Sequence, residues 1–412
     1  MIRKFWSNCL SRLTPLSLFV VLIFFSHLVT LIASVCSNGY AVDSLFFIMG
    51  WDRFMDFFNS MRDVSLGVGA YTERSVIYPP MANLIFLAFS RLFPDSYLST
   101  DFDDRMEWVN YTASWVAVSV FITALALVLF ALFYFFGRHE KKRVNTLVAV
   151  CAICSVGVLS GLERANLAML AIVCTLFYLF SLERDSKVLR ELGLIALAFA
   201  FSLKLYPAVF GWLLITEKRY KEAVRCIIYA LLMLILPSFA FGGPICLWWI
   251  VKNLIRFSSW KSSGSFSAQT WMLAPYISYV FYAFLIFSVG VFLAASLMRK
   301  DRERGFYNST HMVALLMALP SIQMSYSWPF FYFPLFALFE QDWRKSTLPY
   351  YVLMVLPLLP IPIRIGPHSF AEAVIPTLAL LLLILCDTEA IRTIRQWHKK
   401  KSASAKALKG EQ

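Results

Sequence analysis

Apolar runs long enough to cross a membrane recur along this chain from Leu13 to Cys386. A helix needs about 20 apolar residues to cross the hydrocarbon core of a bilayer. Of the 412 residues, 59% are hydrophobic and only 15% are charged, whereas soluble domains carry roughly 25% charged residues. The polar segments between the runs are too short for a separate folded domain. We therefore predict an all-α, polytopic integral membrane protein, a single transmembrane domain (1–412) with about 11–13 transmembrane helices.

The positive charge of the chain is a topology signal. The formal net charge is +13, and most of the 38 Lys and Arg residues fall into seven short clusters. The clusters are residues 1–14, 137–143, 183–190, 217–225, 299–305, 341–345 and the tail from 389. Short loops rich in Lys and Arg stay on the cytoplasmic side. We expect a basic cytoplasmic tail (387–412) in contact with membrane lipids, and no nucleic-acid partner.

The number of candidate membrane spans before the 137–143 cluster is odd. Residues 15–36, 78–93 and 109–136 are three candidate spans, yet two basic segments on the same side require an even number. Either 78–93 enters the membrane and returns, or the acidic linker 101–105 is cytoplasmic. Residues 15–36 resemble the core of a signal peptide but lack an obvious cleavage site, and we interpret them as a retained anchor.

Cys36 and Cys246 both fall in segments expected outside the membrane. They can pair there, and the sequence leaves this pairing open.

The cations outside these clusters fall in the segments predicted to face outside. The first outer loop (36–80) carries Asp52 and Asp56 among a dense set of acidic and basic residues. Lys204 interrupts an apolar stretch next to Pro207, and such a break is tolerated at membrane depth where it lines a polar cavity. The loop 242–271 is rich in Trp and predicts an amphipathic interfacial helix with Arg256 on its cationic face.

Signatures of soluble enzymes are missing from the sequence. It contains no Walker loop, no GxGxxG after a strand, no HExxH and no G-x-S-x-G. Its five His residues show no pair with ligand spacing on an outer face, so we expect no metal site and no cofactor.

Several outward motifs occur in an order that is typical of one family. They are Asp56-Phe57, the segment from Gly67 to Tyr71, the Tyr78-Pro79-Pro80 motif, the turn ending in Asn166, and Lys204 followed by Pro207. This pattern resembles the polyprenol-phosphate-sugar-dependent glycosyltransferases of the GT-C superfamily, and most of all the mannosyltransferase group of glycosyltransferase family 87. The family's G-Q-x-N turn is only partly present, because Glu163 and Arg164 stand within it and no Gln does.

The resemblance implies an inverting transfer in which a carboxylate of the first outer loop is the general base. Asp56 is the expected base and Asp52 its rival. Lys204, Arg164 and Arg256 are the expected ligands of the donor phosphate. The expected substrate pocket contains Tyr78, Tyr71, Glu163, Asn166, Tyr206 and Tyr326.

Structural interpretations of these residues remain open beside the functional ones. Asp56 can instead be a loop carboxylate paired with Arg53 or Arg62. Lys204 can extend to the interface, and Asn166 can cap a helix.

The implied function is transfer of a mannose-like hexose or a pentose from a polyprenyl-phosphate donor to a cell-envelope glycan or glycolipid. The implied location is a bacterial inner membrane, with the site facing the periplasm. Two alternatives are a flippase or transporter of lipid-linked glycans and an envelope polysaccharide polymerase or ligase. A transporter is expected to show internal repeats with matching broken helices, and the second half shows no such match. The sugar and the acceptor are not specified by the sequence.

Overall fold

The computed structural model describes residues 14–45, 54–92, 112–136, 142–261, 275–299, 301–319, 325–339, 346–365 and 368–410. Its first helices are α2 (Pro15–Cys36), α3 (Tyr40–Asp43), α4 (Met55–Ser65), α5 (Gly69–Thr72), α6 (Pro80–Ser90) and α9 (Thr112–Phe136). The middle of the chain forms α10 (Lys142–Ile153), α11 (Val156–Arg164), α12 (Ala168–Leu182), α13 (Lys187–Leu203), η3 (Tyr206–Gly211), α14 (Trp212–Thr216), α15 (Tyr220–Ser238), η4 (Phe239–Phe241) and α16 (Ile245–Lys261). The last part forms α18 (Pro275–Met298), α19 (Asp301–Ala318), η5 (Ser325–Phe331), α20 (Tyr332–Phe339), α21 (Leu348–Val355), η6 (Leu356–Leu358) and α22 (Phe370–Gly410). Strands β1 (Arg364–Ile365) and β2 (His368–Ser369) form a small antiparallel pair.

The predicted all-α membrane fold is confirmed. Among the described residues, α2, α9, α15, α18 and α22 are long and apolar enough to cross a membrane. The pair α10 and α11, bent by 56° at a short break, makes a sixth candidate. This is fewer than the 11–13 spans predicted, because several apolar runs fold into shorter helices of 10–17 residues.

The length of helix α6 helps to explain the odd number of candidate membrane spans before residues 137–143. Its 11 residues rise about 16 Å, roughly half of the ~30 Å hydrocarbon core. Pro80 at its first position fits this start, because proline's fixed φ suits the first turn of a helix. The length of α6 supports the interpretation that 78–93 enters the membrane without crossing it.

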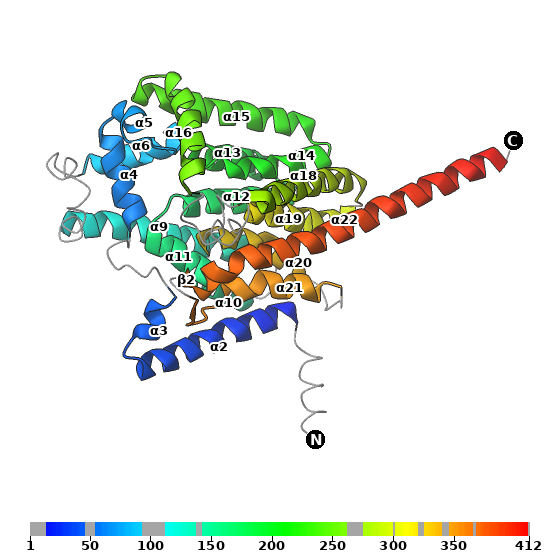
Figure 1. The fold of residues 1–412 in the computed structure, drawn as a ribbon, viewed down its shortest axis with the longest axis horizontal. Coiled ribbons are helices and arrows are strands. Elements are labelled where there is room, and N and C mark those ends of the chain that lie inside the picture. The colour runs from blue at the N-terminus through cyan, green and yellow to red at the C-terminus, as the bar shows by residue number, and fades with distance from the viewer. Residues whose placement is uncertain are drawn as a thin grey trace.

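The two ends of the helical bundle differ in what they carry. In Figure 1, helices α4, α5, α6 and α16 gather at one end, and the C-terminal part of α22 projects beyond the other. Most of α22's tail from residue 387 continues the same helix. The Cys36–Cys246 pairing that the sequence left open is not formed, since both residues are free thiols, one exposed and the other buried.

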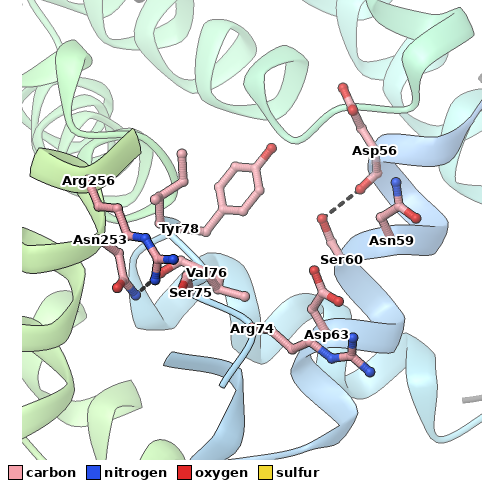
Figure 2. A pocket seen from close by; sticks show the side chains of 11 residues that line it. Asp56, Asn59, Ser60, Asp63, Arg74, Ser75, Val76, Tyr78, Asn253 and Arg256 are labelled. Atoms are coloured by element: carbon pink, nitrogen blue, oxygen red, sulfur yellow. Dashed lines mark hydrogen bonds between the residues drawn. The ribbon is translucent and has the colours of Figure 1, made fainter. Parts of the chain in front are cut away.

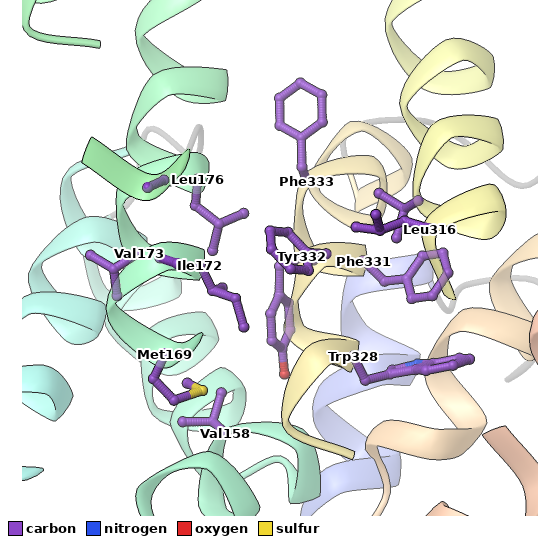
Figure 3. Packing of buried hydrophobic residues seen from close by; sticks show 14 of the residues in the cluster. Val158, Met169, Ile172, Val173, Leu176, Leu316, Trp328, Phe331, Tyr332 and Phe333 are labelled. Carbon is purple, nitrogen blue, oxygen red and sulfur yellow. The ribbon is translucent and has the colours of Figure 1, made fainter. Parts of the chain in front are cut away.

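Aromatic side chains of η5 and α20 fill the centre of the bundle. Figure 3 shows Trp328, Phe331 and Tyr332 packed between α12 on one side and α19 on the other. All three are fully buried. Their polar atoms are satisfied, because the Trp328 indole N–H donates to the carbonyl of Met354 (3.0 Å) and the Tyr332 hydroxyl donates to that of Ala152 (3.2 Å).

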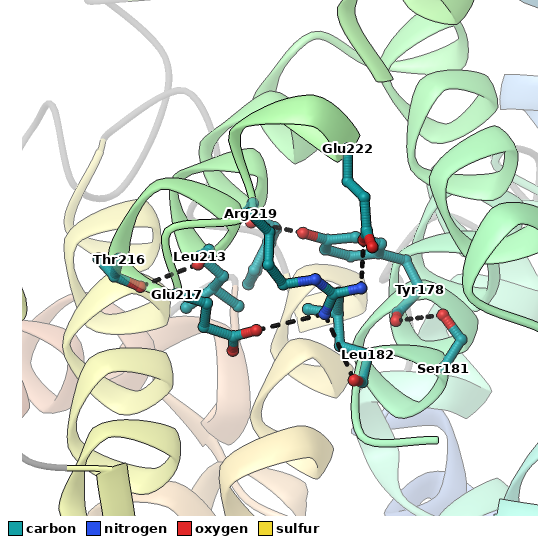
Figure 4. A network of polar contacts seen from close by, with 9 residues as sticks. Tyr178, Ser181, Leu182, Leu213, Thr216, Glu217, Arg219 and Glu222 are labelled. Carbon is teal, nitrogen blue, oxygen red and sulfur yellow. Dashed lines mark hydrogen bonds and ion pairs between the residues drawn. The ribbon is translucent and has the colours of Figure 1, made fainter. Parts of the chain in front are cut away.

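A charged network fixes the turn between α14 and α15 (Figure 4). Arg219 donates to the carboxylate of Glu217 (3.2 Å), to the carbonyl of Leu182 (3.4 Å) and to the carboxylate of Glu222. The network therefore ties the end of α12 to the start of α15.

A second polar cluster is enclosed between α18, α19 and α22. Asp387 accepts a hydrogen bond from the Ser288 hydroxyl (2.5 Å), and its other oxygen lies 3.0 Å from Nε2 of His311. The side chain of Asp387 is 7% exposed and that of His311 is fully buried. Since a buried carboxylate needs partners, this cluster holds the three helices together.

Candidate active site

Asp56 lies in the first turn of α4 and is clamped by two residues distant in sequence. Arg164 donates from Nη2 to Oδ1 of Asp56 (2.5 Å) and from Nε to Oδ2 (3.1 Å). Asn166 donates from Nδ2 to the same Oδ2 (2.6 Å). The N-terminal end of a helix also favours negative charge. The carboxylate is thus held in one orientation.

The turn between α11 and α12 brings both partners to Asp56. Ala165 has φ of 47°, the left-handed conformation, which costs a residue with a Cβ about 1–2 kcal/mol. The Asn166 oxygen accepts from the backbone N–H of Ala168 (2.8 Å), the first residue of α12. A backbone bond from Phe54 to the carbonyl of Glu163 (2.9 Å) joins the start of α4 to the same turn. The strained turn is therefore linked to the Asp56 carboxylate by the side chains of Arg164 and Asn166, and to the start of α4 by the Glu163 carbonyl.

Tyr78 and Lys204 stand beside this clamp. The ammonium of Lys204 lies 4.0 Å from the ring centroid of Tyr78, a cation–π distance. Asn166 also approaches the Tyr78 hydroxyl (3.5 Å). Desolvation of that hydroxyl, followed by the charge of Asp56, raises the pKa of Tyr78 above its ordinary value. The Tyr78 hydroxyl therefore remains protonated and can act as a donor.

The loop before α6 is fastened to α16 and to α6 itself. Asn253 of α16 donates to the carbonyls of Tyr71 (2.9 Å) and Val76 (3.0 Å). The hydroxyl of Tyr71 donates to the Tyr78 carbonyl (3.0 Å) and accepts from Asn83 (2.7 Å). Tyr71 is 1% exposed. Its observed contacts fix the loop backbone.

A cavity of about 670 Å³ opens between α4, the 74–78 segment and α16 (Figure 2). This volume is within the ~300–1,000 Å³ of small-molecule sites. Its lining contains Asp56, Asn59, Ser60, Asp63, Arg74, Ser75, Val76, Ile77, Tyr78, Asn253 and Arg256. Figure 2 shows the Asp56 carboxylate on one side and Arg256 on the other, with the Tyr78 ring between them.

The structure gathers part of the expected site. Asp56, Arg164, Asn166, Tyr78 and Lys204 form one cluster. Of the two partners that the alternative structural interpretation gave to Asp56, Arg62 pairs with Asp63 and Arg53 lies outside the described residues.

Other expected residues make further contacts or lie outside the described residues. The ring of Tyr206 packs against Phe330 with centroids 5.8 Å apart. Glu163 contributes its backbone carbonyl to the turn. Asp52 lies outside the described residues, as does the side chain of Tyr326.

Our interpretation of the sequence missed the polar face of α4 and the role of Asn253. Asn59, Ser60 and Asp63 follow Asp56 at helical spacings of three, four and seven, a pattern visible in MDFFNSMRD. This periodicity was available, whereas nothing in the sequence connects Asn253 with a loop about 180 residues earlier.

One comparison with known proteins identifies the family. The model of glycosyltransferase family 87 matches residues 76–321, which is more than half of the chain. The chain belongs to glycosyltransferase family 87. The match confirms the resemblance inferred from the motifs and makes the protein a glycosyltransferase. It includes Tyr78, Arg164, Asn166 and Lys204 but begins after Asp56. No curated protein and no solved structure matches the chain.

Proposed function

We propose that this glycosyltransferase moves a sugar from a polyprenyl-phosphate donor to a glycan or glycolipid acceptor, with Asp56 as general base. The observation that carries the proposal is the two-sided clamp on Asp56 at the wall of the cavity. A mannose-like hexose or a pentose is the proposed sugar, from the resemblance to the mannosyltransferase group.

The proposed step forms one bond and breaks one. The acceptor hydroxyl oxygen attacks the anomeric carbon of the donor sugar, and the bond from that carbon to the phosphate oxygen breaks. Asp56 takes the hydroxyl proton, and polyprenyl phosphate leaves with the bonding electron pair. A positioned general base contributes about 10²–10⁴-fold to such a rate. Attack opposite the leaving group inverts the anomeric centre.

Three cations are proposed to serve the phosphate. Lys204 and Arg164 lie next to Tyr78 and Asp56, and Arg256 lines the opposite side of the cavity. Fixed cations stabilise the charge that develops on a leaving phosphate. Arg164 then has a second duty, because the same guanidinium orients the base. We also propose that side-chain cations perform this work without a metal ion.

The proposed location is a bacterial inner membrane with the cavity on the periplasmic side. The helices around the cavity lie at one end of the bundle, and the basic tail of α22 extends from the other. Because basic segments remain cytoplasmic, this arrangement favours a cavity that faces outward.

The test is product formation in proteoliposomes from a synthetic polyprenyl-phosphate sugar, in buffer containing EDTA. We expect Asp56→Asn to lower the transfer rate by about 10²–10⁴-fold. Asp185→Asn is the matched control, since Asp185 is exposed in the turn between α12 and α13, and it should transfer at the wild-type rate. Full activity of Asp56→Asn together with an inactive Asp52→Asn would make Asp52 the base.

The experiment also separates the proposal from transport. A flippase for lipid-linked glycans would move the labelled donor across the bilayer without forming a new glycosidic bond. Mass spectrometry of the recovered lipids distinguishes these outcomes, and intact donor as the sole labelled species would contradict the proposal.

A further inference from the structure

Helix α4 presents a continuous polar face to the cavity. Asp56, Asn59, Ser60 and Asp63 all line it, and their spacing places them on one side of an α-helix. The side chains of Met55, Phe58, Met61 and Val64, on the rest of the helix, are buried in the hydrophobic core. Seven residues at 1.5 Å each separate the ends of the polar face, a length of about 10 Å.

The chemistry of this face suits a neutral ligand with many hydroxyl groups. Carboxylates accept hydrogen bonds, and an amide and a hydroxyl both donate and accept. The two carboxylates of this wall, Asp56 and Asp63, are each already paired with an arginine, and neither attracts a phosphate as a free cation would. Of the cationic residues of the lining, Arg256 lies on the opposite side of the cavity, and Arg74 extends from the 74–78 segment beside Asp63 (Figure 2). The α4 wall therefore fits a sugar better than the phosphate of the donor.

Asp63 is held in place by a buried cation. Arg62, whose side chain is 6% exposed, donates to Oδ1 of Asp63 from Nη2 (3.0 Å) and from Nε (3.3 Å). A carboxylate has about four acceptor sites, and both printed bonds from Arg62 go to the same oxygen, Oδ1. A carboxylate fixed in this way lowers the ordering cost of binding, which is the benefit of preorganisation.

We propose that the α4 face is an acceptor subsite that recognises the sugar next to the reacting one, through Asp63 and Asn59. The inference rests on the proposed function, which puts the reacting hydroxyl at Asp56. Since the polar face continues about 10 Å beyond that point, it reaches past a single ring to the next. The acceptor class is then a glycan or glycolipid of at least two sugars.

The test compares acceptors of two lengths on the same aglycone. Octyl glycosides of mannose, glucose and galactose are paired with their octyl disaccharides, and kcat/KM is measured for each with the synthetic donor. We expect wild-type protein to prefer a disaccharide by about 10–100-fold, the effect of one hydrogen bond to a charged group. Asp63→Ala and Asn59→Ala should reduce that ratio to within about threefold while the monosaccharide rate remains. Asp63→Asn, which keeps an acceptor oxygen, should restore part of it.

Two controls keep the outcomes apart. Release of polyprenyl phosphate without acceptor reports donor cleavage by water, so a protein that never cleaves the donor contradicts the proposed function itself. A protein that cleaves the donor but shows equal use, or no use, of both acceptor lengths overturns the subsite. A preference that survives in Asp63→Ala and Asn59→Ala also overturns it. Binding of the same glycosides to nanodisc-embedded variants, with the monosaccharide affinity as reference, excludes loss of fold as the cause.

Discussion

Two aspartates of this protein lie in helices of one bundle and have opposite surroundings. Asp56 is 20% exposed, pairs with a guanidinium and an amide, and faces a cavity of about 670 Å³. Asp387 is 7% exposed and is enclosed by Ser288 and His311 from two neighbouring helices. The two aspartates have a similar number of hydrogen-bonding partners, but only Asp56 of the two lines the cavity that a ligand can enter.

The comparison shows that an ionisable residue within a membrane protein is not by itself a catalytic one. Such residues are costly and are commonly taken as marks of function. Asp387 joins three helices and does not line the cavity beside Asp56, so its polar bonds serve packing. Asp56 has the same need for partners, but Arg164 and Asn166 leave one side of its carboxylate facing the cavity. Asp56 differs from Asp387 in its access to a ligand and in the kind of side chain that it pairs with.

The largest effect is expected at the clamp itself. Arg164→Lys keeps the charge but loses the two parallel donors that orient Asp56, because only a guanidinium can supply both in that geometry. We expect kcat to fall about 10–100-fold, which is part of the ~10²–10⁴-fold attributed to a positioned base. Arg219→Lys, in the network at the α14–α15 turn, is the matched control and should alter thermal stability more than kcat. Equal kcat in Arg164→Lys and wild type would show that the orientation of Asp56 is unimportant.

A smaller effect is expected beside the clamp. Lys204→Met removes the cation over Tyr78 while keeping a long side chain, and it should raise the KM for the donor about tenfold, the equivalent of roughly 1.4 kcal/mol. Lys252→Met removes the cation that lies over Trp249 on α16 and should change KM less than twofold. Steady-state kinetics over a range of donor concentrations measures both. An unchanged KM in Lys204→Met would remove this residue from the donor site.

The smallest effect on catalysis is expected at the enclosed carboxylate. Asp387→Asn disturbs the bonds to Ser288 and His311 and should cost about 1–3 kcal/mol of stability, the range for a disrupted buried polar group. Below the unfolding temperature, kcat should stay within about threefold of wild type. Thermal unfolding in detergent and transfer assays supply the two readouts, with Thr388→Ala on the exposed side of α22 as control. A stable Asp387→Asn protein without activity would make the enclosed cluster functional and would remove the contrast drawn above.

The membrane class and the position of Asp56 were predictable from local patterns. Apolar runs identify a membrane protein by length alone, and the motif order from Asp56 to Lys204 indicated the family. The partner of Asp56 was not predictable, since Arg164 is 108 residues away and nearby arginines were equally suitable in charge. Among the described residues, fewer helices are long enough to cross a membrane than the 11–13 predicted, because hydropathy does not show where a run breaks into two short helices. The structural role of Tyr71 depends on Asn83 and Asn253, whose approach is a property of the folded chain.

The hydrogen bonds of the Asn166 side chain fix which of its two polar atoms faces Asp56. Its oxygen is committed to the first turn of α12, and its nitrogen is therefore the atom that faces Asp56. Hydrolysis of this single amide to an acid would exchange one atom and leave the shape almost unchanged. It would also set two acids against each other across 2.6 Å, and such a pair cannot both ionise freely. Chemical ageing at one position would thus convert the supporting residue into a competitor for the proton that Asp56 has to take.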